Sequence, residues 1–444
     1  MKKIMTIVLA SLVFLSALII CPMNAHAAEF DIDFKTHCTS LYLENIDTST
    51  VVYSKEADTR RYPASTTKIM TYIITAEHVN DFKNTYVTIK SSVLHMLDGT
   101  GSSVAGLEAK EKLSVYQLLN CLMIPSGNDA ALVLADYIGE GDIDKFVQMM
   151  NDKAKALGCT NTHFANPHGL NDPNHYTTVR DMATITKYAL TLPEFIDITD
   201  TVTSDCLGED RYLVTTNYMI DPVRGGDYYY DYAKGIKTGS TGNDSGYCLV
   251  STATRGGYSY LCVAYGAPYE NEDGENYDNG AMIDSKNLYE WAFSNLSIKT
   301  IIEKNDLVKE IDLQFAWNKD KLQLSPANSY STILPDDVAI SSIDKTFHIP
   351  DSIEAPVKEG EKVGTVTLSY ANNELVTIDL VASETVDRSE LLSAIDAIKN
   401  VITSKWFIIS VAVIVILVII YIIVVAVYRR KKKTQRPVKK YRKF

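Results

Sequence analysis

The sequence has few cysteines, and no two of them are closely spaced. It contains seven, of which Cys21 lies in the apolar N-terminal stretch. A zinc site built from cysteines normally includes a closely spaced pair, so we expect no metal and no cofactor. Cys248 and Cys262 could face each other across a hairpin, although two buried thiols are favoured there over a disulfide. The remaining cysteines are Cys38, Cys121, Cys159 and Cys206.

Most of the chain also lacks positive charge. The net charge is −12, yet residues 1–27 carry two lysines and no acidic residue, and residues 429–444 carry ten lysines or arginines and no acidic residue. The part between these ends therefore carries −24. Such an acidic body is repelled by phosphate backbones, so we expect no nucleic-acid partner. The chain shows no internal repeats, and its 444 residues predict two folded units besides its terminal segments.

The N-terminal segment has the pattern of a secretory signal peptide. Residues 1–27 contain a basic start, an apolar run from Ile4 to Ile20, and the small-x-small sequence Ala25-His26-Ala27. This pattern predicts export and cleavage after Ala27. Cys21 leaves lipoprotein processing as an alternative, which is disfavoured because the residue before it is the bulky Ile20.

The C-terminal segment predicts a membrane anchor. Residues 406–428 contain no charge over 23 positions, and a helix of this length reaches ~34 Å, enough to cross a ~30 Å hydrocarbon core. Residues 386–405 predict an amphipathic linker helix before this transmembrane helix. The basic tail, residues 429–444, is expected in the cytoplasm by the positive-inside rule. The body is therefore expected at the extracellular face of the cytoplasmic membrane, held by a single pass.

Between these ends the patterns change from mixed to all-β. Residues 31–297 predict a mixed α/β domain, because strands, a cluster of helices and strands again follow one another. Residues 298–385 contain only short β runs and predict a small all-β domain. Expected strands lie within Asp31–Tyr53 and Gly246–Gly266. Expected helices lie within Ala64–His78, Ser114–Ile124, Asp129–Ile138, Ile143–Leu157, Val179–Leu190 and Met282–Leu296.

Three short motifs occur in the mixed domain. Ser65-x-x-Lys68 opens a helix that is apolar nearly all round, Ser126-Gly127-Asn128 lies in a loop between two helices, and Lys237-Thr238-Gly239 is expected to begin the first strand of a hairpin. Each motif alone is common and has a structural explanation, such as a capped helix, a polar loop or a solvated strand edge. Their combination is much rarer, because each lies on the kind of element that nucleophilic catalysis requires.

The first two motifs supply a nucleophile, a base and a proton relay. Ser65 and Lys68 stand one helical turn apart, so they share a face. A serine hydroxyl needs a base, and burial together with the second cation of Lys237 would lower the pKa of Lys68 enough to make it one. Ser126 can pass a proton to a leaving amine, and Asn128 can bond a peptide amide.

The third motif supplies a substrate-binding edge. A strand that carries Lys237, Thr238 and Gly239 can bind an extended peptide by strand addition. Lys237 and Thr238 offer a charge and a hydroxyl to a substrate carboxylate. The backbone N–H of Ser65 at its helix start and that of Ser240 are the two expected donors to a developing oxyanion.

These motifs resemble the serine-type D-Ala-D-Ala carboxypeptidases, the low-molecular-mass penicillin-binding proteins. The resemblance covers residues 30–385 and includes "YPASTTKIMT", "LLNCLMIPSGNDAA", "FANPHGLNDPNHYTTVRDMA", "GIKTGSTGNDSGYCLVSTA" and "APVKEGEKVGTV". It implies a transpeptidase/β-lactamase-like catalytic fold and removal of the terminal D-alanine from peptidoglycan stems through an acyl-serine. It also implies covalent inhibition by β-lactam antibiotics. The implied roles are nucleophile for Ser65, base for Lys68, relay for Ser126 and carboxylate anchor for Lys237.

Three alternatives remain at this stage. A β-lactamase would share the motifs but would need a carboxylate to activate water, and no such residue is identifiable. A non-catalytic penicillin sensor would need a cytoplasmic domain, and a wall scaffold would not need intact motifs. Two histidines, His168 and His175, invite a triad interpretation, but loop histidines more often bond backbone. Ser245 stands where the family usually has alanine.

Overall fold

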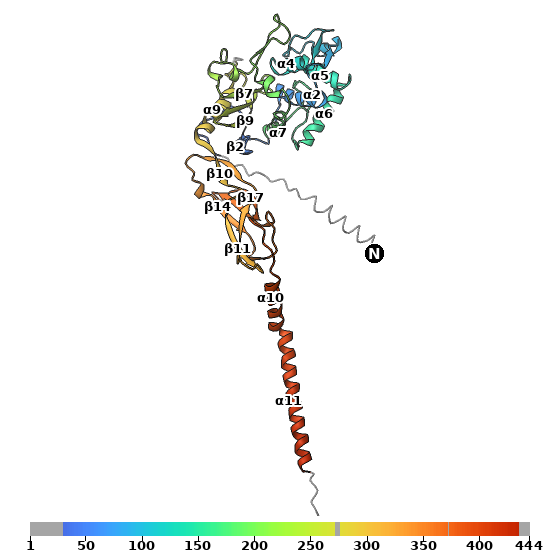
Figure 1. Cartoon of the computed structure of the whole chain (residues 1–444). Coiled ribbons are helices and arrows are strands. Elements are labelled where there is room, and N and C mark those ends of the chain that lie inside the picture. Colours follow the sequence, from blue (N-terminus) through green and yellow to red (C-terminus); the bar gives the residue numbers. More distant parts are fainter. Residues whose placement is uncertain (1–29, 271–275, 372, 435–444) are drawn as a thin grey trace, which may run out of the picture. The chain divides into compact units, whose positions relative to one another are not determined.

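The computed structural model describes residues 30–270, 276–371 and 373–434 (Figure 1). The expected signal peptide and residues 435–444 of the basic tail lie outside the described residues. The described chain forms two compact units. The first contains the residues up to Ile301 together with Tyr330–Asp344 and Ser369–Val376, and the second contains the rest.

The first unit is built on a five-stranded antiparallel sheet with the order β2-β1-β9-β8-β7. Strand β7 lies at one edge, so one side of its backbone is not paired within this sheet. The hairpin expected within Asp31–Tyr53 is present, as is the hairpin expected within Gly246–Gly266. The strands are β1 (Ser40–Asn45), β2 (Thr50–Lys55), β7 (Ala233–Ser240), β8 (Tyr247–Arg255) and β9 (Tyr258–Ala267).

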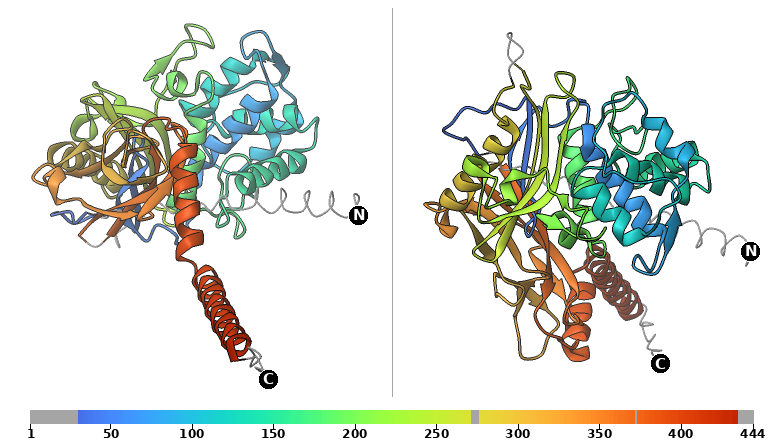
Figure 2. Two further views of the ribbon diagram at one scale, coloured as in Figure 1. Left: turned by 60° about the horizontal axis from the view of Figure 1, so that its bottom comes forward. Right: turned by 90° about the horizontal axis from the view of Figure 1, so that it is seen from above.

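Helices cover both faces of this sheet, which has a separate hydrophobic core on each side. The larger core lies under a helical cluster, coloured blue to green in Figure 2, and the smaller one under α9. All six expected helices are present. The helices are α2 (Lys68–His78), α3 (Ser91–Leu94), α4 (Val115–Met123), α5 (Asn128–Ile138), α6 (Ile143–Ala156), α7 (Val179–Ala189), α8 (Phe195–Thr199) and α9 (Gly280–Asn295).

Shorter elements complete the first unit. Two small antiparallel pairs join β3 to β4 and β5 to β6, and a further pair joins β10 to β13. These strands are β3 (Tyr86–Thr88), β4 (Lys112–Ser114), β5 (Thr203–Ser204), β6 (Leu213–Val214), β10 (Leu296–Ile302) and β13 (Tyr330–Pro335). The 3-10 turns are η1 (Ala64–Thr67), η2 (His95–Leu97), η3 (Tyr218–Ile220), η4 (Gly226–Tyr228) and η5 (Ile340–Ser342).

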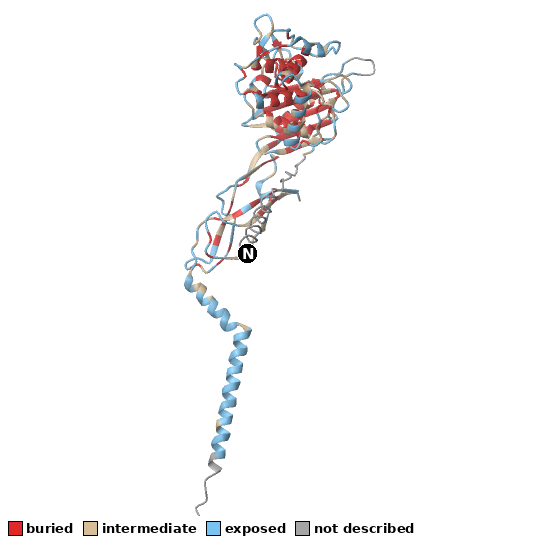
Figure 3. Cartoon of the chain, turned by 90° about the vertical axis from the view of Figure 1, so that its right-hand side faces the viewer, coloured by how far each residue is buried: buried red, intermediate tan, exposed pale blue. Residues whose placement is uncertain are grey.

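Helix α2 is the centre of the larger core. Every residue from Lys68 to Thr75 is buried, in agreement with the apolar surface seen all round this helix in the sequence. Each buried aliphatic side chain, such as Ile69 or Ile73, contributes about 1.5–3 kcal/mol to folding. The packed helices of this unit appear red in Figure 3. A polar side chain at the start of α2 is therefore held in an apolar surrounding.

Two sequence expectations need correction. The Lys237-Thr238-Gly239 motif lies in the second half of β7 and not at its beginning. The strand starts earlier with Ala-Lys-Gly-Ile, a segment too poor in β-branched residues to be recognised. Cys248 belongs to the larger core and Cys262 to the smaller one, so their side chains lie on opposite faces of the sheet. Among the described residues all six cysteines are free thiols.

The second unit contains two helices and a six-stranded sheet, of which only the end of β16, the start of β17 and the first residue of β14 fall in the first unit. Its strand order is β14-β16-β17-β12-β11-β15, and alternating burial along β11 and β17 gives the sheet one buried face. The strands are β11 (Lys309–Gln314), β12 (Lys321–Pro326), β14 (Asp344–His348), β15 (Ser352–Glu354), β16 (Lys362–Tyr370) and β17 (Asn373–Ala382). The helices are α10 (Glu390–Thr403) and α11 (Lys405–Thr434).

Helix α11 contains the expected membrane span. Its stretch Lys405–Lys431 is, in the described part of the chain, the one helix long and apolar enough to cross a membrane, and the mean hydropathy of its 18-residue apolar window is 3.6. Its apolar side chains are exposed, as the pale blue colour in Figure 3 shows. Such a surface is stable in lipid and unfavourable in water, which suggests a membrane anchor.

Candidate active site

Lys68 lies at the meeting point of three polar groups. Its Nζ is 2.9 Å from Ser65 Oγ, 2.6 Å from Asn128 Oδ1 and 2.8 Å from the carbonyl oxygen of His168. Asn128 and His168 offer only acceptors here, so they take two N–H groups of the amine. The remaining tetrahedral position faces Ser65, and in the neutral amine it holds the lone pair that can take the hydroxyl proton.

The surroundings of Lys68 favour that neutral form. The side chain is fully buried, and this desolvation lowers its pKa well below the ordinary lysine value, with a further lowering from the charge of Lys237. The carboxylate of Asp129 opposes the shift but is already engaged. Its two oxygens accept hydrogen bonds from the backbone N–H groups of Ala105, Ala130 and Leu107. The sequence expectation of a deprotonated lysine base is thus supported by the geometry.

Ser65 lies in the 3-10 turn η1, which is fitted tightly between two glycines. A Cβ on Gly239 of β7 would lie 3.1 Å from the backbone nitrogen of Ser65. A Cβ on Gly169 would lie 1.9 Å from the carbonyl oxygen of Ala64, and Gly169 has φ +96°. Only glycine allows both strand β7 and the loop at Gly169 to approach the backbone of the turn that carries Ser65 so closely.

Ser126 has a buried hydroxyl without a hydrogen-bond partner in the described part of the chain. Its Oγ accepts or donates no hydrogen bond among the described residues, and its backbone adopts φ +65°. A buried hydroxyl without a partner is unfavourable by about 1–3 kcal/mol. Ser126 is followed by Gly127 and then by Asn128, the first residue of α5, so the expected relay residue lies two positions before a hydrogen-bond partner of Lys68. The hydroxyl is available to a bound substrate.

Lys237 is a second buried lysine. Its side chain is 1% exposed, and burial lowers its pKa to about 7. Its Nζ donates to the carbonyl oxygen of Thr238 at 3.2 Å, and among the described residues it forms no ion pair with a carboxylate. The hydroxyl of Thr238 lies 2.5 Å from that of Thr216. A buried cation without an anion is suited to receive one from a substrate.

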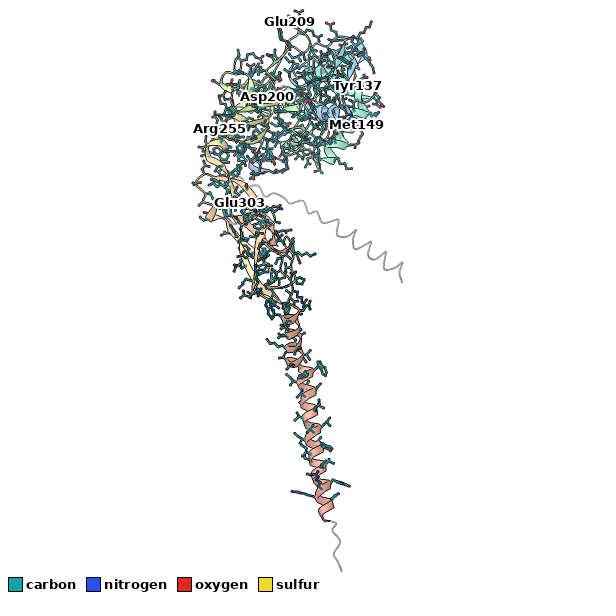
Figure 4. The ribbon with its side chains drawn as sticks, in the orientation of Figure 1. Tyr137, Met149, Asp200, Glu209, Arg255 and Glu303 are labelled. Atoms are coloured by element: carbon teal, nitrogen blue, oxygen red, sulfur yellow. The ribbon has the colours of Figure 1, made fainter. Side chains whose placement is uncertain are left out.

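Strand β7 is fixed at its start by Asp200, which Figure 4 labels. The Asp200 carboxylate accepts from Lys234 Nζ at 3.0 Å and from the backbone N–H of Gly235 at 3.2 Å. At the other end, the exposed side chain of Ser240 accepts from the N–H of Gly242 at 3.2 Å. Ser240 directly follows Gly239, the residue packed on Ser65, and its backbone N–H remains the expected second oxyanion donor.

The two histidines are not members of a triad. His175 Nδ1 accepts from the N–H of Ala165 at 2.9 Å, so Nε2 carries the proton and donates to Thr67 Oγ1 at 2.7 Å. Burial lowers the pKa of His175 to about 4 and that of His168 to about 3. His168 Nδ1 accepts from the N–H of Leu170 at 3.2 Å. Both side chains are neutral and brace the backbone.

Sequence reasoning missed three residues that shape this site. No motif marks these three residues. His168 and Gly169 act through their backbone, and Thr216 reaches Thr238 from a segment 22 positions away in the sequence. The stretch "NPHGL" was visible only as part of the family resemblance. The change at Ser245 has a local effect, because its Oγ accepts from the N–H of Thr241 at 2.8 Å and donates to the carbonyl of Gly246 at 2.9 Å.

Comparison with known proteins supports the same assignment. The family model described as D-alanyl-D-alanine carboxypeptidase matches residues 24–268, and the model of the C-terminal domain of penicillin-binding protein 5 matches residues 297–388. The D-alanyl-D-alanine carboxypeptidase DacF of Bacillus subtilis is 30% identical over 351 residues, which are 78% of this chain and 85% of the relative. The D-alanyl-D-alanine carboxypeptidase of Streptomyces strain K15 is 37% identical over 233 residues, which are 50% of this chain and 77% of the relative.

Solved structures agree with this match. Penicillin-binding protein 5 of Haemophilus influenzae has a TM-score of 0.65 and 25% identity, covering 81% of this chain and 100% of that structure. The carboxypeptidase DacD of Francisella tularensis has a TM-score of 0.64 and 26% identity, covering 82% and 98%. The resemblance seen in the sequence is confirmed, and so is the mixed α/β fold followed by a small all-β domain and an apolar C-terminal helix. The chain belongs to the D-alanyl-D-alanine carboxypeptidase family of penicillin-binding proteins, which are serine hydrolases.

Proposed function

We propose that Ser65 is the nucleophile and Lys68 the base with which this carboxypeptidase removes the terminal D-alanine of peptidoglycan stem peptides. The observation that carries the proposal is the fully buried Lys68 amine, 2.9 Å from the Ser65 hydroxyl. A base of depressed pKa in contact with a serine at a helix start is what acyl transfer requires.

In the acylation step, Lys68 Nζ takes the hydroxyl proton while Ser65 Oγ attacks the carbonyl carbon of the penultimate D-alanine. The backbone N–H groups of Ser65 and Ser240 stabilise the oxyanion of the tetrahedral intermediate. When the C–N bond breaks, the proton on Lys68 passes through Ser126 Oγ to the leaving amine. The products of this step are an ester on Ser65 and free D-alanine.

In the second step, a water molecule hydrolyses the ester. Lys68 accepts a proton from the water molecule while the water oxygen attacks the ester carbonyl. Ser65 Oγ then leaves and takes this proton back from Lys68. Among the described residues, the carboxylate that acts on Lys68 is that of Asp129, and it is a poor base for this step because it accepts hydrogen bonds from three backbone N–H groups. A β-lactam that acylates Ser65 is therefore expected to remain bound for a long time.

Substrate selection depends on the far end of the peptide. The terminal carboxylate pairs with Lys237 and Thr238, which have no anionic partner within the described protein. The peptide adds as a strand along β7, which Gly239 keeps close to Ser65. Asn128 holds the amide of the residue before the scissile bond. A peptide without a free C-terminal carboxylate would leave Lys237 buried and unpaired, so it would bind poorly.

The enzyme is proposed to act at the outer face of the cytoplasmic membrane. The N-terminal pattern of residues 1–27 favours export, and α11 supplies an apolar span. The basic residues after α11 favour a cytoplasmic C-terminus. This topology places the catalytic unit on the side where peptidoglycan is assembled.

The proposal is tested with the full chain in detergent. We expect D-alanine release from a D-Ala-D-Ala peptide and a penicillin adduct in the intact mass, and both should be absent in Ser65→Ala. An adduct that persists in Ser65→Ala would exclude Ser65 as the nucleophile. An adduct that decays within seconds would instead indicate a β-lactamase.

A further inference from the structure

A large cavity is lined by segments that adjoin Ser65 and β7 in the sequence, and it lies outside the machinery described above. Its volume is about 860 Å³, within the size range of small-molecule sites. Its wall includes Arg60, Arg61 and Tyr62, which precede the nucleophile turn, and the segment Asn243–Gly246, which follows β7. Tyr62 is three residues from Ser65, so at most ~11 Å of chain separates them.

The two arginines of this cavity have no carboxylate partner among the described residues. Arg60 lies with its guanidinium 4.3 Å from the ring centre of Tyr176 and donates weakly to Asn161 at 3.4 Å. Arg61 donates through Nε to the hydroxyl of Ser40 at 2.9 Å. Within the described residues neither forms an ion pair, whereas Arg180, Arg211 and Arg224 of the same unit each do.

The two acidic residues of the cavity bond to asparagine side chains and form no ion pair with these arginines among the described residues. The carboxylate of Asp244 accepts from Asn171 Nδ2 at 2.6 Å, and that of Glu270 accepts from Asn243 Nδ2 at 3.2 Å. The cavity thus holds two arginines and two carboxylates, and the guanidinium groups of Arg60 and Arg61 are free of ion pairs within the described residues. Guanidinium groups that line a concave surface are suited to hold a carboxylate.

The direction of the substrate leads toward this cavity. In the proposed function, the terminal carboxylate lies at Lys237 and Thr238, and the scissile carbonyl lies between Ser65 and Ser240. The residues before the scissile bond must then run past Ser240 toward Thr241 and the turn that follows β7. At ~3.3 Å per residue in an extended chain, two or three residues reach the segment Asn243–Gly246.

The turn at the cavity is held in place. Thr241 donates through Oγ1 to Asn171 Oδ1 at 2.8 Å, and its N–H donates to Ser245 Oγ at 2.8 Å. The buried residues Ser245 and Gly246 line the cavity. The Ser245 hydroxyl, where the family usually has alanine, thus stabilises a wall of the cavity. A preformed wall lowers the entropic cost of binding.

We infer that this cavity binds a carboxylate on the part of the stem peptide that precedes the scissile bond, with Arg60 and Arg61 as its partners. The inference rests on the proposed function and adds a specificity site to it. The half-buried tyrosines Tyr62 and Tyr176 provide apolar contact for the aliphatic part of the same residue. The site would favour stems with a free acidic group over stems in which that group is an amide.

The test compares two peptides on the full chain in detergent. One is acetyl-L-Ala-γ-D-Glu-L-Lys-D-Ala-D-Ala, and the other carries a carboxamide in place of the free glutamate carboxylate. We expect KM for D-alanine release to be roughly five- to twentyfold lower for the acidic peptide, with similar kcat, because a charge-assisted bond is added. In Arg60→Gln and in Arg61→Gln, the KM values of the two peptides should differ by less than about twofold, because KM for the acidic peptide rises.

Arg255→Gln is the matched control. Arg255, labelled in Figure 4, ends β8, whereas Asn243–Gly246 precedes the start of that strand. This variant should keep the preference of the wild type. Unchanged acylation by penicillin in all three variants establishes that each is folded.

The outcomes separate the two proposals. Equal KM for both peptides in the wild type would overturn the inference, as would an arginine variant that weakens both peptides alike. Failure to release D-alanine from either peptide would contradict the proposed function instead.

Discussion

Asn128 Oδ1 accepts a hydrogen bond from Lys68 Nζ at 2.6 Å, and 60 residues separate the two in the sequence. The amide oxygen takes an N–H group without adding a negative charge, so it orients the amine and leaves its pKa low. A carboxylate at the same place would stabilise the ammonium form. The neutrality of residue 128 is therefore part of what makes Lys68 a base.

The first prediction concerns Asn128→Asp. The new carboxylate would form a buried ion pair with Lys68 and raise its pKa, so at neutral pH the amine could not accept the Ser65 proton. We expect acylation by penicillin to slow by roughly 100-fold or more at pH 7 and to recover as pH rises. The measurement is the acylation rate constant across pH. Asn128→Ala adds no charge, so it should slow acylation without shifting the pH dependence of the acylation rate constant. Identical profiles for Asp and wild type would contradict the argument.

The second prediction concerns substrate affinity and pH. Lys237 has a pKa of about 7 in the free enzyme, and only its protonated form attracts the terminal carboxylate. KM should therefore rise as pH increases above about 7, while kcat does not fall because Lys68 must be neutral. In Lys237→Arg the cation persists at all these pH values, so KM should be nearly independent of pH. A rise of KM in the arginine variant equal to that of the wild type would assign the titration to another group.

The third prediction concerns the free energy of unfolding, which the burial of Lys237 lowers. The folded pKa of Lys237 lies below its unfolded value of 10.5, so between these values the unfolded state binds more protons, and the free energy of unfolding rises with pH. At pH 7, Lys237→Met should raise the free energy of unfolding by ~1–3 kcal/mol, because the variant has no buried amine and so no desolvation penalty. This gain in stability should shrink as the pH approaches 10.5, the pKa of Lys237 in the unfolded chain. Urea unfolding of the full chain in detergent measures both quantities, and a gain that is constant with pH would count against this cause.

The sequence predicted the motif residues because each carries its chemistry in its own side chain. Ser65, Lys68 and Ser126 could be found from spacing, and the burial of Lys68 followed from the apolar surface all round its helix. The contact of Lys68 with the carbonyl of His168 could not be found, because any residue type presents the same carbonyl. Helix starts with capping residues, such as Ser114 in its capping box with Gln117, are similarly visible.

Other features depend on segments that meet only after folding. The start of β7 was missed because two glycines and few β-branched residues obscure the strand, whose place is fixed by pairing with β8 and by Asp200. The opposite orientation of Cys248 and Cys262 depends on the register of β8 against β9, where Ser251 and not Cys248 lies opposite Cys262. The local residue pattern predicts that a strand forms, but the register in which it pairs depends on the other strands of the sheet.

The last prediction concerns Gly169→Ala, a change far from the motifs in sequence. The new Cβ would lie 1.9 Å from the carbonyl oxygen of Ala64, so the turn that holds Ser65 must move. Because a displacement of about 1 Å can lower a rate by about 100-fold, we expect acylation by penicillin to fall by roughly that factor. The matched control is Gly158→Ala, since Gly158 also has a positive φ of +82° but has nothing within 4 Å of the added Cβ. Gly158→Ala should lose about 1 kcal/mol of stability through backbone strain and keep its acylation rate. If both variants acylate at the wild-type rate, the contact between Gly169 and Ala64 does not position the nucleophile, and if both slow equally, backbone strain and not this contact is the cause.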